Sequence, residues 1–127
     1  MPDKRSHRGP HPADDKLFAA GEISNLLGAI ADFSLLLTKG YAEKSALKLV
    51  GDRFSLTERQ RIAVMRSACS DDQLASRKHR RIELENLTDK SIAVDGYNVL
   101  ITIEAAMSGG VILKGRDGCF RDRKSVV

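Results

Sequence analysis

Four acidic residues in the last third of the chain could together bind a divalent cation. Asp95 ends an apolar run, Glu104 lies in the element after it, and Asp117 and Asp122 follow a second apolar run. If both runs are strands of one parallel sheet, Asp95 and Asp117 would meet at the same edge. Clustered carboxylates suit Mg²⁺ or Mn²⁺, which can activate water for attack on a phosphodiester.

The same acids also have an ordinary structural explanation. Asp95 and Gly96 are common turn residues, and Asn98 could cap a helix over residues 98–108. Glu104 would join the other acids only if its side of that helix faced inward. The pattern alone therefore leaves two alternatives open, a metal site or a turn that leads into a helix.

A second group of candidate residues is basic. Arg77, Lys78, Arg80 and Arg81 fall within one short stretch, and Arg77, Arg80 and Arg81 share a helix face if the helix persists. Guanidinium groups match phosphate oxygens, so this stretch could bind a nucleic-acid backbone. The alternative is a solvated face whose cations pair with nearby acids. No aromatic residue interleaves the stretch, so the sequence does not indicate base stacking.

Helical patterns fill the chain before these basic residues. Apolar residues recur at three- and four-residue steps over 14–39, where Gly21 could break the helix and Lys39-Gly40 could end it. A second helix is expected over 42–50, ending at Gly51. The pairs Thr57/Gln60 and Ser70/Gln73 predict capping boxes for two further helices. Ile62, Met65 and Ala68 would form the apolar face of the first of these two.

After residue 85 the pattern becomes mixed. We expect a strand over 91–95, a helix over 98–108, a second strand over 111–114 and a turn at 116–118. The expected organisation is a disordered basic tail (1–13), a helical module (14–85) and an α/β segment (86–127).

Composition narrows the class of protein. The chain has 127 residues, a formal net charge of +4 and two cysteines without metal-ligand spacing. This charge permits a polyanion partner such as RNA without requiring one. Neither of the phosphate-binding motifs GxxxxGK[ST] and GxGxxG occurs in the sequence, so no nucleotide cofactor is expected. With no secretory signal and no run judged long enough for a membrane span, we expect a soluble, cytoplasmic protein without membrane contact.

Several long phrases resemble one family, a domain of unknown function numbered 434. The resemblance covers roughly residues 14–122 and is carried by Leu-Leu-Thr-Lys-Gly-Tyr at 36–41, Leu-Thr-Glu-Arg-Gln-Arg at 56–61 and Val-Asp-Gly-Tyr-Asn at 94–98. It implies a helical module followed by the start of a PIN-like nuclease domain, an α/β/α fold whose acids bind Mg²⁺ or Mn²⁺ and whose members often cleave RNA.

The resemblance also implies roles for individual residues. Asp95 matches the first catalytic aspartate of PIN-like domains and Asn98 the polar residue often found just after it, with Glu104, Asp117 and Asp122 as further candidates. The family's pattern continues beyond Asp122, whereas this chain ends differently at 123–127.

The fold class that we expect is α/β and α-rich, a helical module followed by a truncated PIN-like β-α-β segment. The leading functional hypothesis is a PIN-like, metal-dependent ribonuclease relative with little or no activity in these 127 residues. The alternative is a non-catalytic module that binds RNA or protein.

Overall fold

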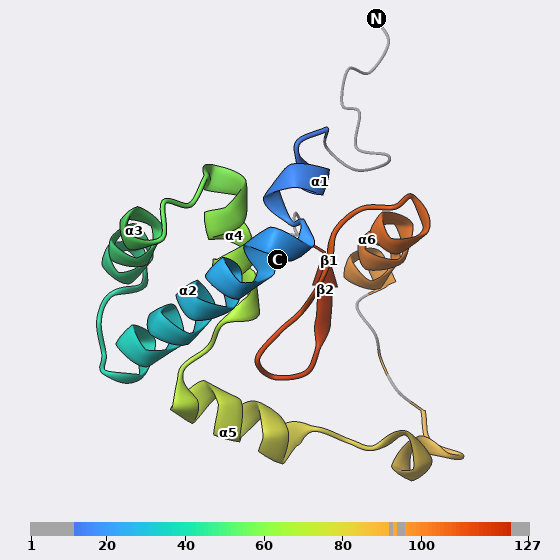
Figure 1. Ribbon diagram of the computed structural model, residues 1–127. Helices are drawn as coiled ribbons and strands as arrows, with labels where there is room; N and C mark the ends of the chain where they lie inside the picture. Colours follow the sequence, from blue (N-terminus) through green and yellow to red (C-terminus); the bar gives the residue numbers. More distant parts are fainter. Residues whose placement is uncertain (1–11, 92, 94–95, 123–127) are drawn as a thin grey trace, which may run out of the picture.

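Helices dominate the part of the chain that the computed structural model describes, which is residues 12–91, 93 and 96–122 (Figure 1). The α-rich character and the small sheet expected from the sequence are confirmed, whereas the predicted tail lies almost wholly outside the described residues. In chain order the elements are α1 (Asp14–Leu17), α2 (Ala20–Thr38), α3 (Glu43–Arg53), α4 (Glu58–Ser67), α5 (Asp71–Arg80), the 3₁₀ turn η1 (Leu84–Leu87), α6 (Gly96–Met107), β1 (Ile112–Lys114) and β2 (Phe120–Asp122).

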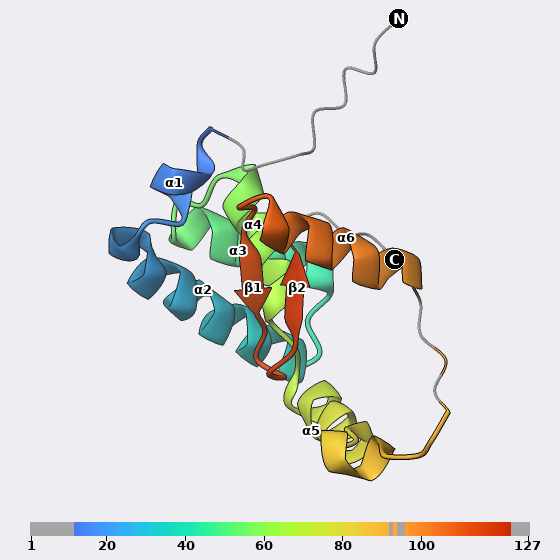
Figure 2. The same cartoon turned by 90° about the vertical axis from the view of Figure 1, so that its right-hand side faces the viewer.

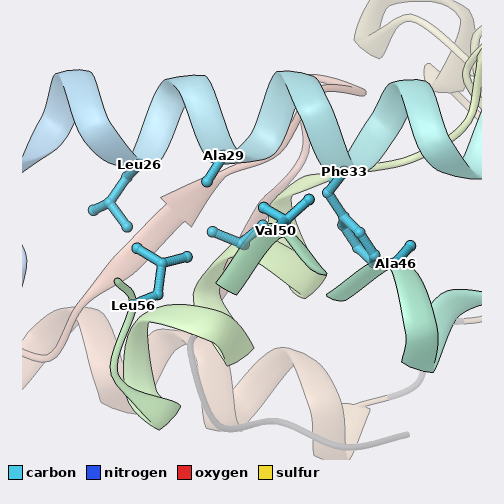
Figure 3. Packing of buried hydrophobic residues seen from close by; sticks show 8 residues of the cluster. Leu26, Ala29, Phe33, Ala46, Val50 and Leu56 are labelled. Carbon is cyan, nitrogen blue, oxygen red and sulfur yellow. The ribbon is translucent and has the colours of Figure 1, made fainter. Parts of the chain in front are cut away.

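Helix α2 forms the centre of the core. Its residues Leu26, Ala29 and Phe33 are buried and pack against α3 and α4 (Figure 3). Phe33 is among the largest side chains buried completely. Because a Phe or Leu side chain contributes about 1.5 to 3 kcal/mol when fully buried, this three-helix contact is the main source of stability in the helical part. The remaining buried members of the cluster are Ala46, Val50, Leu56, Val64 and Ala68.

The two glycines expected to end helices behave differently. Gly40 has a φ of +92° and follows α2, where the amides of Gly40 and Tyr41 bond the carbonyls of Leu37 and Leu36. This pair of hydrogen bonds forms a Schellman motif, so the predicted end of the helix is confirmed. Gly51 lies inside α3, which continues to Arg53. A Cβ on Gly51 would collide with the Arg61 guanidinium, so close side-chain approach explains this glycine.

Both predicted capping boxes are present. The Thr57 hydroxyl accepts from the amide of Gln60, and the Gln60 side chain accepts from the amide of Thr57. Ser70 and Gln73 make the same reciprocal pair at the start of α5. Each box satisfies two amides that a helix start leaves without partners, and this local chemistry fixes where α4 and α5 begin.

The buried face of α4 differs from the predicted one. Met65 was expected in the core but is 36% exposed, whereas the polar Gln60 and Ser67 are buried with Ala63 and Val64. Gln60 tolerates burial because its amide group donates to the Leu17 carbonyl while its oxygen completes the capping box. Ala68 is buried and Ile62 half-buried as predicted, so the prediction fails for Met65 only, and hydrophobic spacing missed the two buried positions that are polar.

The sheet is an antiparallel hairpin of β1 and β2. Ile112 pairs with Asp122, Leu113 with Arg121 and Lys114 with Phe120, and Gly118 in the connecting turn has a φ of +81°. The predicted strand over 111–114 is therefore found, but its partner is β2 and not the strand expected over 91–95. Residues 92, 94 and 95 of that strand lie outside the described residues, and Ser91 and Ala93 have no regular structure.

Helix α6 follows this region and begins at Gly96. Asn98 consequently lies inside its first turn, so the prediction that Asn98 caps the helix is wrong. Figures 1 and 2 show α6 beside the strands, while the hairpin turn extends past α6 toward α5.

Helix α2 is long and apolar enough to cross a membrane by length and composition alone. This differs from the expectation that no run in the chain is long enough for a membrane span. Only 22% of the most apolar 18-residue stretch of this helix is buried in the structure. The four buried side chains on one side of α2 give that side a packing role in the core.

Candidate nucleic-acid interface

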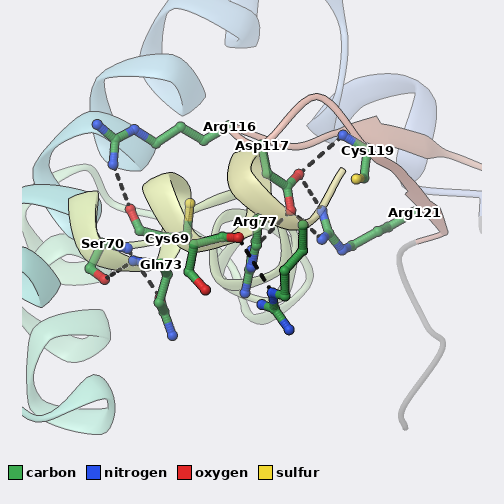
Figure 4. A network of polar contacts seen from close by, with 10 residues as sticks. Cys69, Ser70, Gln73, Arg77, Arg116, Asp117, Cys119 and Arg121 are labelled. Carbon is green, nitrogen blue, oxygen red and sulfur yellow. Dashed lines mark hydrogen bonds and ion pairs between the residues drawn. The ribbon is translucent and has the colours of Figure 1, made fainter. Parts of the chain in front are cut away.

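The hairpin turn is fixed to the junction between α4 and α5. The Arg116 amide donates to the Ser67 carbonyl at 2.7 Å, and Arg116 Nη1 donates to the Cys69 carbonyl at 2.8 Å. Arg116 Nη2 pairs with Asp71 Oδ1 at 2.6 Å (Figure 4). These bonds join residues nearly fifty positions apart in the sequence, and they hold the hairpin against the helical part.

Asp117 is the centre of a second set of contacts in the same turn. Arg121 donates to both carboxylate oxygens, at 3.0 and 2.6 Å, and Arg77 Nη1 donates to Oδ2 at 2.9 Å. The Cys119 amide donates to Oδ1 at 3.1 Å. The Asp117 side chain is only 1% exposed, so this buried carboxylate links α5 to β2 through two arginines (Figure 4).

The electrostatics of this cluster favour the ionised carboxylate. The hydrogen bonds from Arg121 hold the pKa of Asp117 well below its usual range, against the opposing effect of burial, and the Cys119 amide and Arg77 act in the same direction as Arg121. The same bonds to Asp117 raise the pKa of Arg121. Because a buried charge is tolerated when it is paired and hydrogen-bonded, the cluster is stable as an ionic contact.

The predicted basic stretch divides into two parts. Arg77 lies in α5 and is engaged by Asp117. Lys78 and Arg80 are exposed, and neither has an ion-pair partner among the residues that the structure describes. Arg81 is 59% exposed with Glu83 at 3.8 Å, a long and weak pair. We call residues 78–81 the basic end of α5, and this end presents cations to solvent.

The predicted acidic site is resolved only in part. Asp95 lies outside the described residues, and the side chains of Asn98 and Asp122 are not described. Glu104 is exposed on α6, whereas Asp117 is buried in the hairpin turn. Within the described ranges, no three His, Cys, Asp or Glu side chains are grouped as metal ligands.

Sequence reasoning missed three residues that shape this region. Arg116 and Arg121 fix the turn, and Phe120 is 66% exposed on β2 beside it. The signal present in the sequence is the Asp117-Gly118 pair, which is typical of tight turns, but no strand was expected after that turn. Arg116 has its role through contacts with Ser67, Cys69 and Asp71, which lie more than forty positions away, and sequence spacing does not reveal such contacts.

Comparison with known proteins finds one uncharacterised relative and two families of unknown function. No solved structure matches it significantly. The uncharacterised protein MJ0935 of Methanocaldococcus jannaschii is 33% identical over 95 residues. The match covers 75% of this chain but 46% of that protein, so the chain spans less than half of its relative's length.

Two protein families match successive parts of the chain. Residues 84–127, which contain α6 and the hairpin, match a domain of unknown function (DUF5616). Residues 25–80, which contain most of α2 and all of α3 to α5, match a protein family of unknown function (DUF434). Over this helical region the chain therefore belongs to the DUF434 family.

Proposed function

We propose that this protein binds RNA through the basic end of α5. The observation that supports the proposal is that Lys78 and Arg80 are exposed without ion-pair partners in the described part of the chain, and that Arg81 adjoins them with only a distant acid. One helical turn rises about 5 Å, so these cations are concentrated in a small area. Cations placed in this way neutralise phosphates and release counterions, which drives nucleic-acid binding.

The position of these cations also agrees with the structure of α5. Asp71 and Asp72 lie in its first turn and the basic residues in its last, an arrangement that the helix dipole stabilises. The helix dipole favours cations at this end of α5, but fewer cations would be enough to compensate it. Arg77 already fixes the helix to the hairpin, which leaves the other three cations to contact a ligand.

The test is the salt dependence of RNA affinity. In the double variant K78Q/R80Q we expect weaker binding and a slope of log K against log salt that is smaller by about 1.4, the value for two lost contacts to a single strand. The matched control K16Q/K44Q removes two exposed lysines from α1 and α3 and has the same net charge. Equal losses in both variants would show that the affinity comes from overall charge, and wild-type affinity in K78Q/R80Q would contradict the proposal.

Metal-dependent cleavage of RNA, the activity implied by the PIN-like resemblance, stays a prediction, as do the PIN-like β-α-β fold and the cytoplasmic location. Asp95 would be its central Mg²⁺ or Mn²⁺ ligand, with Glu104, Asp117 and Asp122 in support. Asp117 would first have to release Arg77 and Arg121, which occupy both of its oxygens. RNA cleavage that depends on Mn²⁺ and disappears in Asp95→Asn would assign this activity. Binding that ignores Asp95→Asn but falls in K78Q/R80Q supports the non-catalytic module.

A further inference from the structure

We propose that Phe120 stacks on an unpaired base, so that the ligand of this surface is single-stranded RNA. This inference rests on the RNA binding proposed above and specifies its substrate. Phe120 is the first residue of β2 and is 66% exposed. It pairs across the hairpin with the exposed Lys114, whose Nζ lies 6.0 Å from the centre of the Phe120 ring. Directly opposed residues project from the same face of a hairpin, so the aromatic ring and the ammonium group are presented together.

The fold places the turn that precedes Phe120 next to the basic end of α5. Arg81 Nη1 lies 3.4 Å from the position that a Cβ atom would take on Gly118, two residues before Phe120. Figures 1 and 2 both show the hairpin turn directed toward α5. The hairpin that carries the Phe120 ring and Lys114 therefore has an α5 cation at its turn, although no aromatic residue interrupts the basic stretch in the sequence.

The contacts of the turn hold this arrangement in place. Arg116 ties the turn to Cys69 and Asp71, and Asp117 ties it to Arg77 on α5 (Figure 4). Arg77 and Arg81 are four residues apart and so lie on the same side of the helix. Arg77 is bonded to the turn, and the Arg81 guanidinium lies close to Gly118 in that turn. The hairpin that carries the ring is thus fixed to α5, and such preorganisation lowers the entropy lost when a ligand binds.

This chemistry distinguishes single strands from duplexes. Every base has a π face that can stack on an aromatic ring, but in a duplex the bases already stack on one another. Phosphate contacts alone would bind either form, because both present a phosphate backbone. The exposed Phe120 ring with Lys114 beside it therefore favours a strand whose bases are unpaired, and the nearby cations would contact the phosphates of that strand.

The experiment compares an unstructured 12-nucleotide RNA with a duplex of the same length, followed by fluorescence anisotropy. We expect Phe120→Ala to weaken single-strand binding about tenfold and to leave duplex binding unchanged. Tyr41→Ala is the matched control, because Tyr41 is an aromatic residue that is 52% exposed elsewhere on the surface. Circular dichroism should show that Phe120→Ala, a change at an exposed site, retains the helical content.

A second variant reports stacking directly. The chain contains no tryptophan, so Phe120→Trp introduces a single indole that should bind at least as tightly as wild type. Its fluorescence should be quenched by the single strand and not by the duplex. Equal affinity for both RNA forms, unchanged in Phe120→Ala but reduced in K78Q/R80Q, would overturn the stacking proposal and leave RNA binding intact. Absence of RNA binding would overturn both, and self-association lost in Phe120→Ala without any effect on RNA would assign Phe120 to a protein interface instead.

Discussion

Replacement of Asp117 by asparagine should destabilise the protein by detaching the hairpin from α5. Asparagine keeps the size of the side chain but removes its charge, and its amide nitrogen cannot accept from the arginines. The carboxylate now accepts from Arg121, Arg77 and the Cys119 amide while its own side chain is 1% exposed. The change therefore leaves one acceptor oxygen for two guanidinium groups and removes the charge with which both of them pair.

The size of the effect follows from the exposure of the partners. Removal of one member of a fully buried ion pair costs about 3 to 5 kcal/mol. Here the side chains of Arg77 and Arg121 are 36% and 26% exposed, so water can solvate part of each freed charge. We therefore expect the free energy of unfolding to fall by about 2 kcal/mol in Asp117→Asn, between the values for exposed and buried pairs.

Urea denaturation followed by circular dichroism measures this difference. Asp52→Asn is the matched control, because Asp52 also accepts from two cations, Lys48 and Arg61, but its side chain is 56% exposed. The control should lose less than about 1 kcal/mol. If Asp117→Asn lost no more than the control, the idea that the buried carboxylate holds the hairpin would be wrong.

The pH dependence gives an independent check on the same cluster. The pKa of Asp117 is lower in the folded protein than in the unfolded chain, so its stabilising contribution is complete above a pH of about 4. This contribution is lost progressively as the pH falls from there toward the folded-state pKa. The stability gap between wild type and Asp117→Asn should consequently be constant from pH 7 to 5 and shrink below pH 4. A gap that stayed constant at pH 3 would contradict the assigned ion pairs.

Two further predictions concern the helical part. Phe33→Ala should lower the free energy of unfolding by about 4 kcal/mol because it empties a site in the core that is 1% exposed, whereas Leu35→Ala, at 53% exposure on the same helix, should cost less than about 1 kcal/mol. Equal costs in urea denaturation would show that the packing of α2 is assigned to the wrong face. Thr57→Ala should cost about 1 kcal/mol through the lost α4 cap, and Thr57→Ser should restore most of it, since serine supplies the same hydroxyl acceptor.

The helix boundaries were largely predictable because their chemistry is local. The pairs Thr57/Gln60 and Ser70/Gln73 lie within four residues, so a capping box can be recognised wherever it occurs. Errors arose where a distant group decides the outcome. Gly51 is predicted to end a helix, but α3 continues through it to Arg53, with the Arg61 side chain close to its Cα, and the burial of Gln60 depends on its bond to the Leu17 carbonyl.

For the candidate site, the charged residues, the turn and the end of the basic helix could all be predicted from the amino-acid sequence. It indicated the basic stretch at 77–81 and the turn at 116–118, because charge density and the Asp-Gly pair are local properties. How these residues are used depends on the folded chain. Arg77 contacts Asp117, forty residues away, and the turn that precedes the exposed Phe120 lies beside Arg81. Such pairings depend on how the hairpin packs against distant helices, and packing is set by the whole fold rather than by the spacing of neighbouring residues.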